Sequence, residues 1–265
     1  MSVVRLFGLG VRTTLDLSGS RADELSRTIR SAWSRCLEPR GEELDGRTLH
    51  VSLNHPEENG RSEEGVLAGS NLTNLMQMLT QEVTHSNIAT QTGRLLMLHA
   101  AAVGNPDTGA SLALVAPGGT GKTTLARLLG AEYAYLTDET VGIREDGVIL
   151  PYEKPLSIRR SPKSWEKDEV SPDALGLRRP VARPRLRSLA LIRREPGHRR
   201  PKIVEMGVMD ALVTLAPETS ALSDLPNPLG LFASHLDSVG PALHITYEEA
   251  ESLLPTFRDV LGVPG

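Results

Sequence analysis

The stretch that decides the fold is SLALVAPGGTGKTTLARLLG, residues 111–130. It begins with an apolar run, residues 112–116, that is typical of a buried strand. The run breaks at Pro117-Gly118-Gly119, and leucines then recur at helical spacing after Lys122. Strand, glycine-rich loop, Gly-Lys-Thr and helix is the order that a phosphate-binding P-loop requires. The sequence therefore predicts an α/β fold built around this unit.

The loop residues have the chemistry that a nucleotide phosphate needs. Gly118, Gly119 and Gly121 can take positive φ and lack a Cβ, so their N–H groups can turn inward around an anion. Lys122 supplies positive charge to the β- and γ-phosphates, which makes it a candidate catalytic residue, and the Thr123 hydroxyl can ligate Mg²⁺. We therefore predict that ATP binds here with Mg²⁺. The predicted nucleotide contacts are Pro117, Gly118, Gly119, Thr120, Gly121, Lys122, Thr123 and Thr124.

One position departs from the usual motif, which opens with Gly where this chain has Ala116. Alanine is small enough to keep the loop, so we interpret it as a tolerated variant. The alternative is a glycine-rich strand–helix turn that binds nothing. Gly-Lys-Thr with the correct structure predicted on both flanks favours the P-loop.

Composition limits the classes of protein and partner. The 265 residues suffice for one large or two modest domains. With 29 Lys and Arg against 33 Asp and Glu, and 3% aromatic residues, nucleic acid is not expected as a partner. The single cysteine, Cys36, excludes an intramolecular disulfide. No apolar run reaches the roughly 18 residues of a membrane span, and the start lacks the apolar core of a secretory signal, so we expect a cytoplasmic protein without membrane contact.

The chain is predicted to divide near residue 90. Residues 1–90 alternate strand and helix patterns without a chemical motif and predict a small α+β domain. Residues 91–265 carry the P-loop and form the second predicted domain. Within it, residues 161–185 combine proline, serine and charge with little periodicity, which predicts a long loop.

Two segments that flank the P-loop carry candidate catalytic residues. The apolar run 95–103 contains His99 and leads through a polar turn into the P-loop strand, which predicts a β-hairpin. The alternative is that His99 is a core residue whose polar atoms are hydrogen-bonded within the protein. The short strand 133–136 is followed by Asp138 and Glu139, placed where a magnesium ligand or a general base belongs. The alternative is an ordinary acidic turn.

Basic residues concentrate between residues 178 and 202. They form either a solvated rim around a strand or an electropositive approach for phosphates or an acidic partner. His235 and His244 have no partner at metal spacing, so we interpret both as structural.

Four segments together resemble a known family: LLMLHAAAV, APGGTGKTTLARLL, YLTDETVGI and YEKPLSIR. In this order they are similar to the catalytic domain of HPr kinase/phosphorylase, and more so to the smaller HprK-like serine kinases, which include lasso-peptide kinases. The resemblance spans residues 70–260. It implies a P-loop mixed-sheet core of the HPr kinase and phosphoenolpyruvate carboxykinase type beside the small N-terminal α+β domain. It also implies transfer of the γ-phosphoryl group of ATP to a serine-like hydroxyl, and a homo-oligomer.

The resemblance also implies roles for individual residues. Asp138 would accept the proton of the substrate hydroxyl, and Glu139 would hold Mg²⁺ together with Thr123. His99 would line the site near the transferred phosphate. Arg159 would approach the phosphates from the Pro-Leu-Ser-Ile segment.

Other features separate this chain from the true HPr kinases. Its acid pair is Asp-Glu instead of Asp-Asp, which lengthens one ligand by a methylene. Its P-loop continues Thr-Thr instead of Ser-Glu, and it lacks a glycine-rich signature for HPr, so the expected acceptor is a hydroxyl on another small molecule, peptide or protein. Two alternatives stay open: an ATP-binding regulatory module without catalysis, favoured by the Asp-Glu change, and a partner-dependent ATPase. A nucleic-acid role would rest on the arginine cluster alone.

Overall fold

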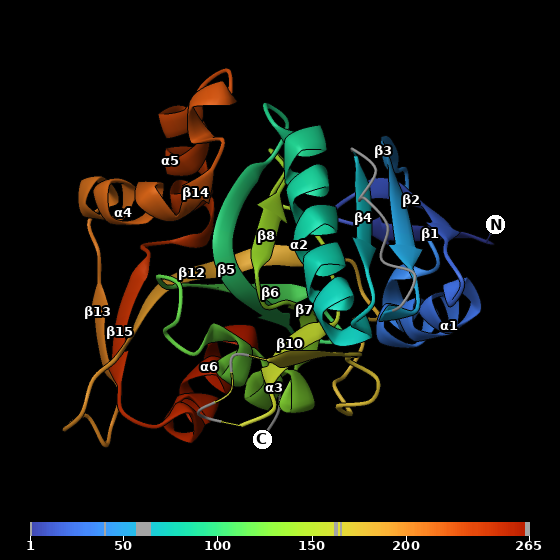
Figure 1. Ribbon diagram of the computed structural model, residues 1–265. Coiled ribbons are helices and arrows are strands. Elements are labelled where there is room, and N and C mark those ends of the chain that lie inside the picture. Colours follow the sequence, from blue (N-terminus) through green and yellow to red (C-terminus); the bar gives the residue numbers. More distant parts are fainter. Residues whose placement is uncertain (1, 40, 57–64, 162–163, 165, 263–265) are drawn as a thin grey trace. The chain divides into compact units, whose positions relative to one another are not determined.

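The strands of the described residues form three sheets, with four, two and nine strands (Figure 1). The computed structural model describes residues 2–39, 41–56, 65–161, 164 and 166–262. The first unit comprises Met1–Gln91 and Tyr152–Leu175, and the second comprises Thr92–Pro151 and Gly176–Gly265. A domain boundary near residue 90 places Tyr152–Leu175 with the P-loop, whereas the structure groups this segment with the N-terminal unit.

The first unit contains a four-stranded sheet covered by helices α1 (Ala22–Ala32) and α2 (Leu72–Gln91). The first two strands form an antiparallel hairpin, and Leu9 and Gly10 at its tip both have positive φ, as a tight hairpin turn requires. The next two pairings are parallel. Its strands, in spatial order, are β1 (Ser2–Gly8), β2 (Val11–Ser18), β3 (Leu44–Leu53) and β4 (Val66–Gly69).

A second hairpin completes the first unit. Strands β10 (Leu156–Arg159) and β11 (Lys167–Val170) pair antiparallel, so the predicted long loop is wrong at β11. Its sequence, KDEV, lacks the apolar alternation by which a strand is recognised. The strand is held instead by polar contacts, because Glu169 accepts hydrogen bonds from Ser157 (2.6 Å) and from Thr80 of α2 (3.1 Å).

The second unit is built on a nine-stranded mixed sheet, which confirms the predicted fold class. β12 runs parallel to both β6 and β15, whereas β5 runs antiparallel to β6. The main strand order is β13 (Lys202–Glu205), β15 (Leu243–Tyr247), β12 (Arg185–Arg194), β6 (Ala110–Val115), β5 (Leu96–Gly104), β8 (Thr140–Ile143) and β9 (Ile149–Leu150). Two shorter strands also pair with β5, namely β7 (Ala134–Thr137) and β14 (Thr219–Ser220).

The predicted hairpin before the P-loop is present as β5 and β6. Both strands are buried along almost their whole length, which explains their continuous apolar sequence. Asn105 forms the turn by accepting hydrogen bonds from the backbone N–H groups of Asp107 (2.9 Å) and Thr108 (3.1 Å). The Asn105 amide also donates to the Leu261 carbonyl (3.0 Å), which ties the last helix to the hairpin.

Apolar residues of the strands and of two helices form a buried core in this unit. Within the described residues, four α-helices accompany the sheet. They are α3 (Lys122–Glu132), α4 (Val208–Leu215), α5 (Pro228–Val239) and α6 (Leu254–Leu261). Among the described residues, no helix has the length and apolar character that crossing a membrane would need.

Candidate active site

The predicted P-loop, residues 116–121, connects β6 to α3 and is shaped by two of its three glycines. Gly119 and Gly121 have φ of 79° and 92°, in the left-handed region that L-residues avoid. Gly118 has the same conformational freedom, but its φ lies outside this region. The Thr120 hydroxyl closes the loop by donating to the Pro117 carbonyl at 2.7 Å.

The loop ends at the beginning of helix α3, for which Gly121 is the N-cap residue. No side chain among the described residues caps this helix, so its first-turn N–H groups keep their donors for a ligand. The same end carries the positive pole of the helix dipole. Thr123 and Thr124 lie in this first turn, half-buried and exposed respectively. The contacts of the loop with a nucleotide stay a prediction.

Lys122 is the cation of this loop and is 7% exposed. Its ammonium donates to the carbonyl oxygens of Ala116 and Pro117, the latter at 3.2 Å. Alanine at the first motif position thus offers the lysine the same backbone acceptor that glycine would. Burial lowers the pKa of Lys122, and the negative charges of Glu218, Glu139 and Asp138 oppose that shift.

The sheet brings the predicted acids to the same edge as the loop. Ala100 on β5 pairs with Val115, the last residue of β6, and its N–H donates to the Glu139 carbonyl at 3.1 Å. Asp138 and Glu139 therefore lie beside the point where the chain leaves β6 for the P-loop. His99 precedes Ala100 and is at the same edge.

Asp138 is held in place by a neighbouring phenol. Its side chain is buried, and one carboxylate oxygen accepts a hydrogen bond from the Tyr135 hydroxyl at 3.0 Å. The Thr137 hydroxyl accepts from the N–H groups of Glu139 (3.2 Å) and Thr140 (3.4 Å), which fixes the turn that carries both acids. A buried, oriented carboxylate has the geometry of a general base.

His99 is half-buried and interacts with charged groups on both sides. Burial lowers the pKa of His99, and the positive charge of Lys122 lowers it further. The carboxylates of Glu139 and Glu218 and a hydrogen bond to the Glu139 backbone oppose the shift. The net direction is downward, so the imidazole is neutral at pH about 7.

Glu218 is a carboxylate of this site that the sequence reasoning missed. β14 pairs with β5 through Thr219 and Leu98. It lies along the same side of β5 as β6, just beyond Val115, where β6 ends. Glu218 directly precedes Thr219 and lines a cavity together with the P-loop. No local motif marks this residue, because only strand pairing brings it to the loop.

A cavity of about 1030 Å³ opens beside the P-loop, on the side of β12 and β15. β6, β12 and β15 are parallel, and the cavity lies outside their carboxyl ends, where open α/β sheets bind ligands. Its walls come from the P-loop, the ends of β12 and β15, and α4. The residues that line it are Pro117, Gly119, Thr120, Gly121, Leu191, Ile192, Arg193, Arg194, Pro196, Thr214, Glu218, His244, Glu248 and Glu249.

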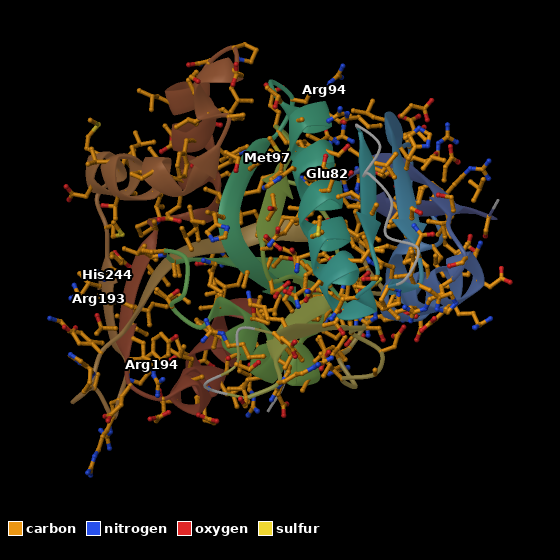
Figure 2. The ribbon with its side chains drawn as sticks, in the orientation of Figure 1. Glu82, Arg94, Met97, Arg193, Arg194 and His244 are labelled. Carbon is orange, nitrogen blue, oxygen red and sulfur yellow. The ribbon has the colours of Figure 1, made fainter. Side chains whose placement is uncertain are left out.

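Two members of the arginine cluster line this cavity, Arg193 and Arg194 (Figure 2). Arg178 and Arg185 of the same cluster have a different role, because their side chains donate hydrogen bonds to backbone carbonyls, at 2.9 Å and 2.6 Å. His244, interpreted from sequence as structural, also lines the cavity (Figure 2). Its Nε2 atom is buried and has no hydrogen-bond partner among the described residues.

The predicted roles of Thr123 and Glu139 as Mg²⁺ ligands, and of Arg159 as a phosphate contact, stay untested. Arg159 ends β10 in the first unit, so its approach to the phosphates stays a prediction. In the described part of the chain, no three His, Cys, Asp or Glu side chains are grouped to hold a metal ion by themselves. Mg²⁺ commonly takes only one or two protein ligands beside substrate phosphates, so the donors of Thr123 and Glu139 are chemically suited to such an ion.

Comparisons with known proteins give distant structural likenesses alone. No family model and no curated protein matches the chain. Among solved structures, the HPr(Ser) kinase/phosphatase from Coxiella burnetii is similar with a TM-score of 0.32 and 11% sequence identity. The match covers 63% of this chain and 93% of that chain.

Proposed function

We propose that this protein is a magnesium-dependent kinase that transfers the γ-phosphoryl group of ATP to a hydroxyl of a small molecule, peptide or protein. The proposal rests on the charged and titratable side chains that lie together at one edge of the sheet. The buried ammonium of Lys122 lies in a P-loop, and Asp138, Glu139 and His99 lie at the same edge of the sheet.

The loop and the helix supply the binding of the phosphates. Inward N–H groups of the P-loop and the first turn of α3 bind the phosphate oxygens, and Lys122 neutralises charge that develops on them. Mg²⁺, held by Thr123 and Glu139, would neutralise further charge between the β- and γ-phosphates. Most of the rate enhancement would come from such positioning and charge neutralisation.

Asp138 acts as the general base in this proposal. The acceptor oxygen bonds to the γ-phosphorus while the bond from that phosphorus to the β–γ bridging oxygen breaks, and ADP leaves. The hydroxyl proton passes to the Asp138 carboxylate. The hydrogen bond from Tyr135 orients that carboxylate before the acceptor arrives. Neutral His99 adds a hydrogen-bonding group without a second positive charge.

The experiment is transfer of label from γ-labelled ATP in the presence of Mg²⁺, with free serine, free threonine and serine-containing peptides as acceptors. Asp138→Asn removes the base and nearly keeps the volume of the side chain. We expect label on an acceptor with the wild type, and a loss of at least about a hundredfold in the variant. Asp237→Asn, on the exposed face of α5, is the matched control and should transfer like the wild type.

Two other outcomes would replace the proposal. Tight ATP binding without transfer or hydrolysis, across the acceptor panel, would identify a regulatory binding module. Steady hydrolysis without any labelled acceptor would identify an ATPase, and Asp138→Asn should then abolish hydrolysis.

A further inference from the structure

We infer that the cavity beside the P-loop holds the nucleoside half of the nucleotide, with the base against Arg194. This inference rests on the proposed function, because it presupposes a triphosphate on the P-loop. It adds the location of the nucleoside and the way in which the base is recognised.

The direction of the triphosphate follows from the strand order. Asp138 and Glu139 lie beside β5, on one side of the P-loop strand β6, whereas β12 and β15 lie on the other side. The γ-phosphate must face the acids, since they act on the acceptor and the metal. The α-phosphate and the nucleoside must then extend away from the acids. That direction leads to the ends of β12 and β15, where the cavity opens.

The cavity has the size and the lining of a small-molecule site. Its volume of about 1030 Å³ matches the upper end of the roughly 300–1,000 Å³ typical of ligand pockets. Leu191 and Ile192 give it an apolar surface, and Thr214 and His244 add polar groups.

Hydrogen bonds hold together the far wall of the cavity. Arg194 Nε donates to the Glu248 carbonyl at 2.8 Å, and its Nη2 lies 3.2 Å from the Glu249 carboxylate. The Glu195 N–H donates to the Tyr247 carbonyl at 2.7 Å, which joins the turns after β12 and β15. These contacts orient the guanidinium of Arg194, whose side chain is 60% exposed.

A fixed, planar guanidinium is suited to stack on a base. Every base offers a π-face, so stacking by Arg194 would accept purines with little discrimination among them. We therefore expect Mg·ATP and Mg·GTP to bind with affinities within about tenfold of each other.

The test compares Mg²⁺ complexes of ATP and of inorganic tripolyphosphate by calorimetric titration. Arg194→Lys keeps the positive charge but removes the planar group. It should weaken ATP binding about tenfold and leave tripolyphosphate binding within about twofold of the wild type. Arg187→Lys is the matched control, because Arg187 is exposed on the same strand and does not line the cavity.

The outcomes separate this inference from the function on which it rests. If Arg194→Lys weakens both ligands equally, or neither, while the wild type binds both, the nucleoside is not in the cavity and the P-loop proposal survives. If the wild type binds neither ligand, the proposed function itself fails. Thermal unfolding of each variant shows whether it is folded, and Arg194→Gln provides a second substitution if the lysine variant is not.

Discussion

Two glycines of the P-loop allow a direct test of its backbone geometry. Gly121 has φ of 92°, whereas the φ of Gly118 lies outside the left-handed region. A Cβ added at either position meets no atom of the described residues within 4 Å, apart from chain neighbours. Gly121→Ala therefore costs backbone strain of about 1–2 kcal/mol, and Gly118→Ala costs none. Both variants gain about 0.4–1 kcal/mol from a stiffer unfolded chain, which cancels in the difference between them.

Thermal unfolding of the free protein measures this difference. About 1–2 kcal/mol corresponds to a Tm of Gly121→Ala roughly 2–8 °C below that of Gly118→Ala. Titration with Mg·ATP then shows whether the strained variant also binds more weakly, as a distorted loop should. Equal Tm values for the two variants would refute the assigned loop conformation.

The remaining predictions concern three ionisable side chains: Arg35, Glu218 and His235. Arg35 and Glu153 form an ion pair at 2.9 Å with each side chain 1% exposed, so Arg35→Met should destabilise the first unit by about 3–5 kcal/mol. Urea unfolding followed by tryptophan fluorescence measures this, and a loss below about 1 kcal/mol would contradict the burial of the pair. The charge of Glu218 raises the pKa of Lys122, so Glu218→Gln should lower that pKa and speed acylation of the Lys122 amine at pH about 9. Unchanged labelling, measured by mass spectrometry, would place Glu218 away from the lysine. Burial lowers the pKa of His235, so the unfolded chain binds its proton more tightly and stability falls as pH drops below about 6.5. His235→Phe should therefore reduce the change in Tm between pH about 7.5 and about 5.5, and an unchanged pH dependence would contradict this assignment.

The sequence predicted the parts of the fold that local pattern specifies. The apolar run 112–116, the glycines and the leucine spacing indicated a strand, a loop and a helix, and β6 and α3 occupy those positions. The apolar run 95–103, predicted as the first strand of a hairpin, is β5, Leu96–Gly104. In each case the residues that determine the element are neighbours in the chain, so their spacing is sufficient.

The sequence did not reveal features that depend on distant pairing. Arg35 contacts Glu153 across 118 positions, which helps to join Tyr152–Leu175 to the first unit. Glu218 reaches the P-loop because Thr219 pairs with Leu98. Such contacts follow from strand order, which no local periodicity encodes.

Phosphorus NMR of ATP and Mg²⁺ during titration with the protein tests directly whether the loop binds phosphate. We expect the wild type to perturb the β- and γ-phosphate resonances, and Lys122→Ala, folded but without the loop cation, to perturb them far less. Unperturbed resonances with the wild type, or equal perturbation by both proteins, would contradict a phosphate site at this loop.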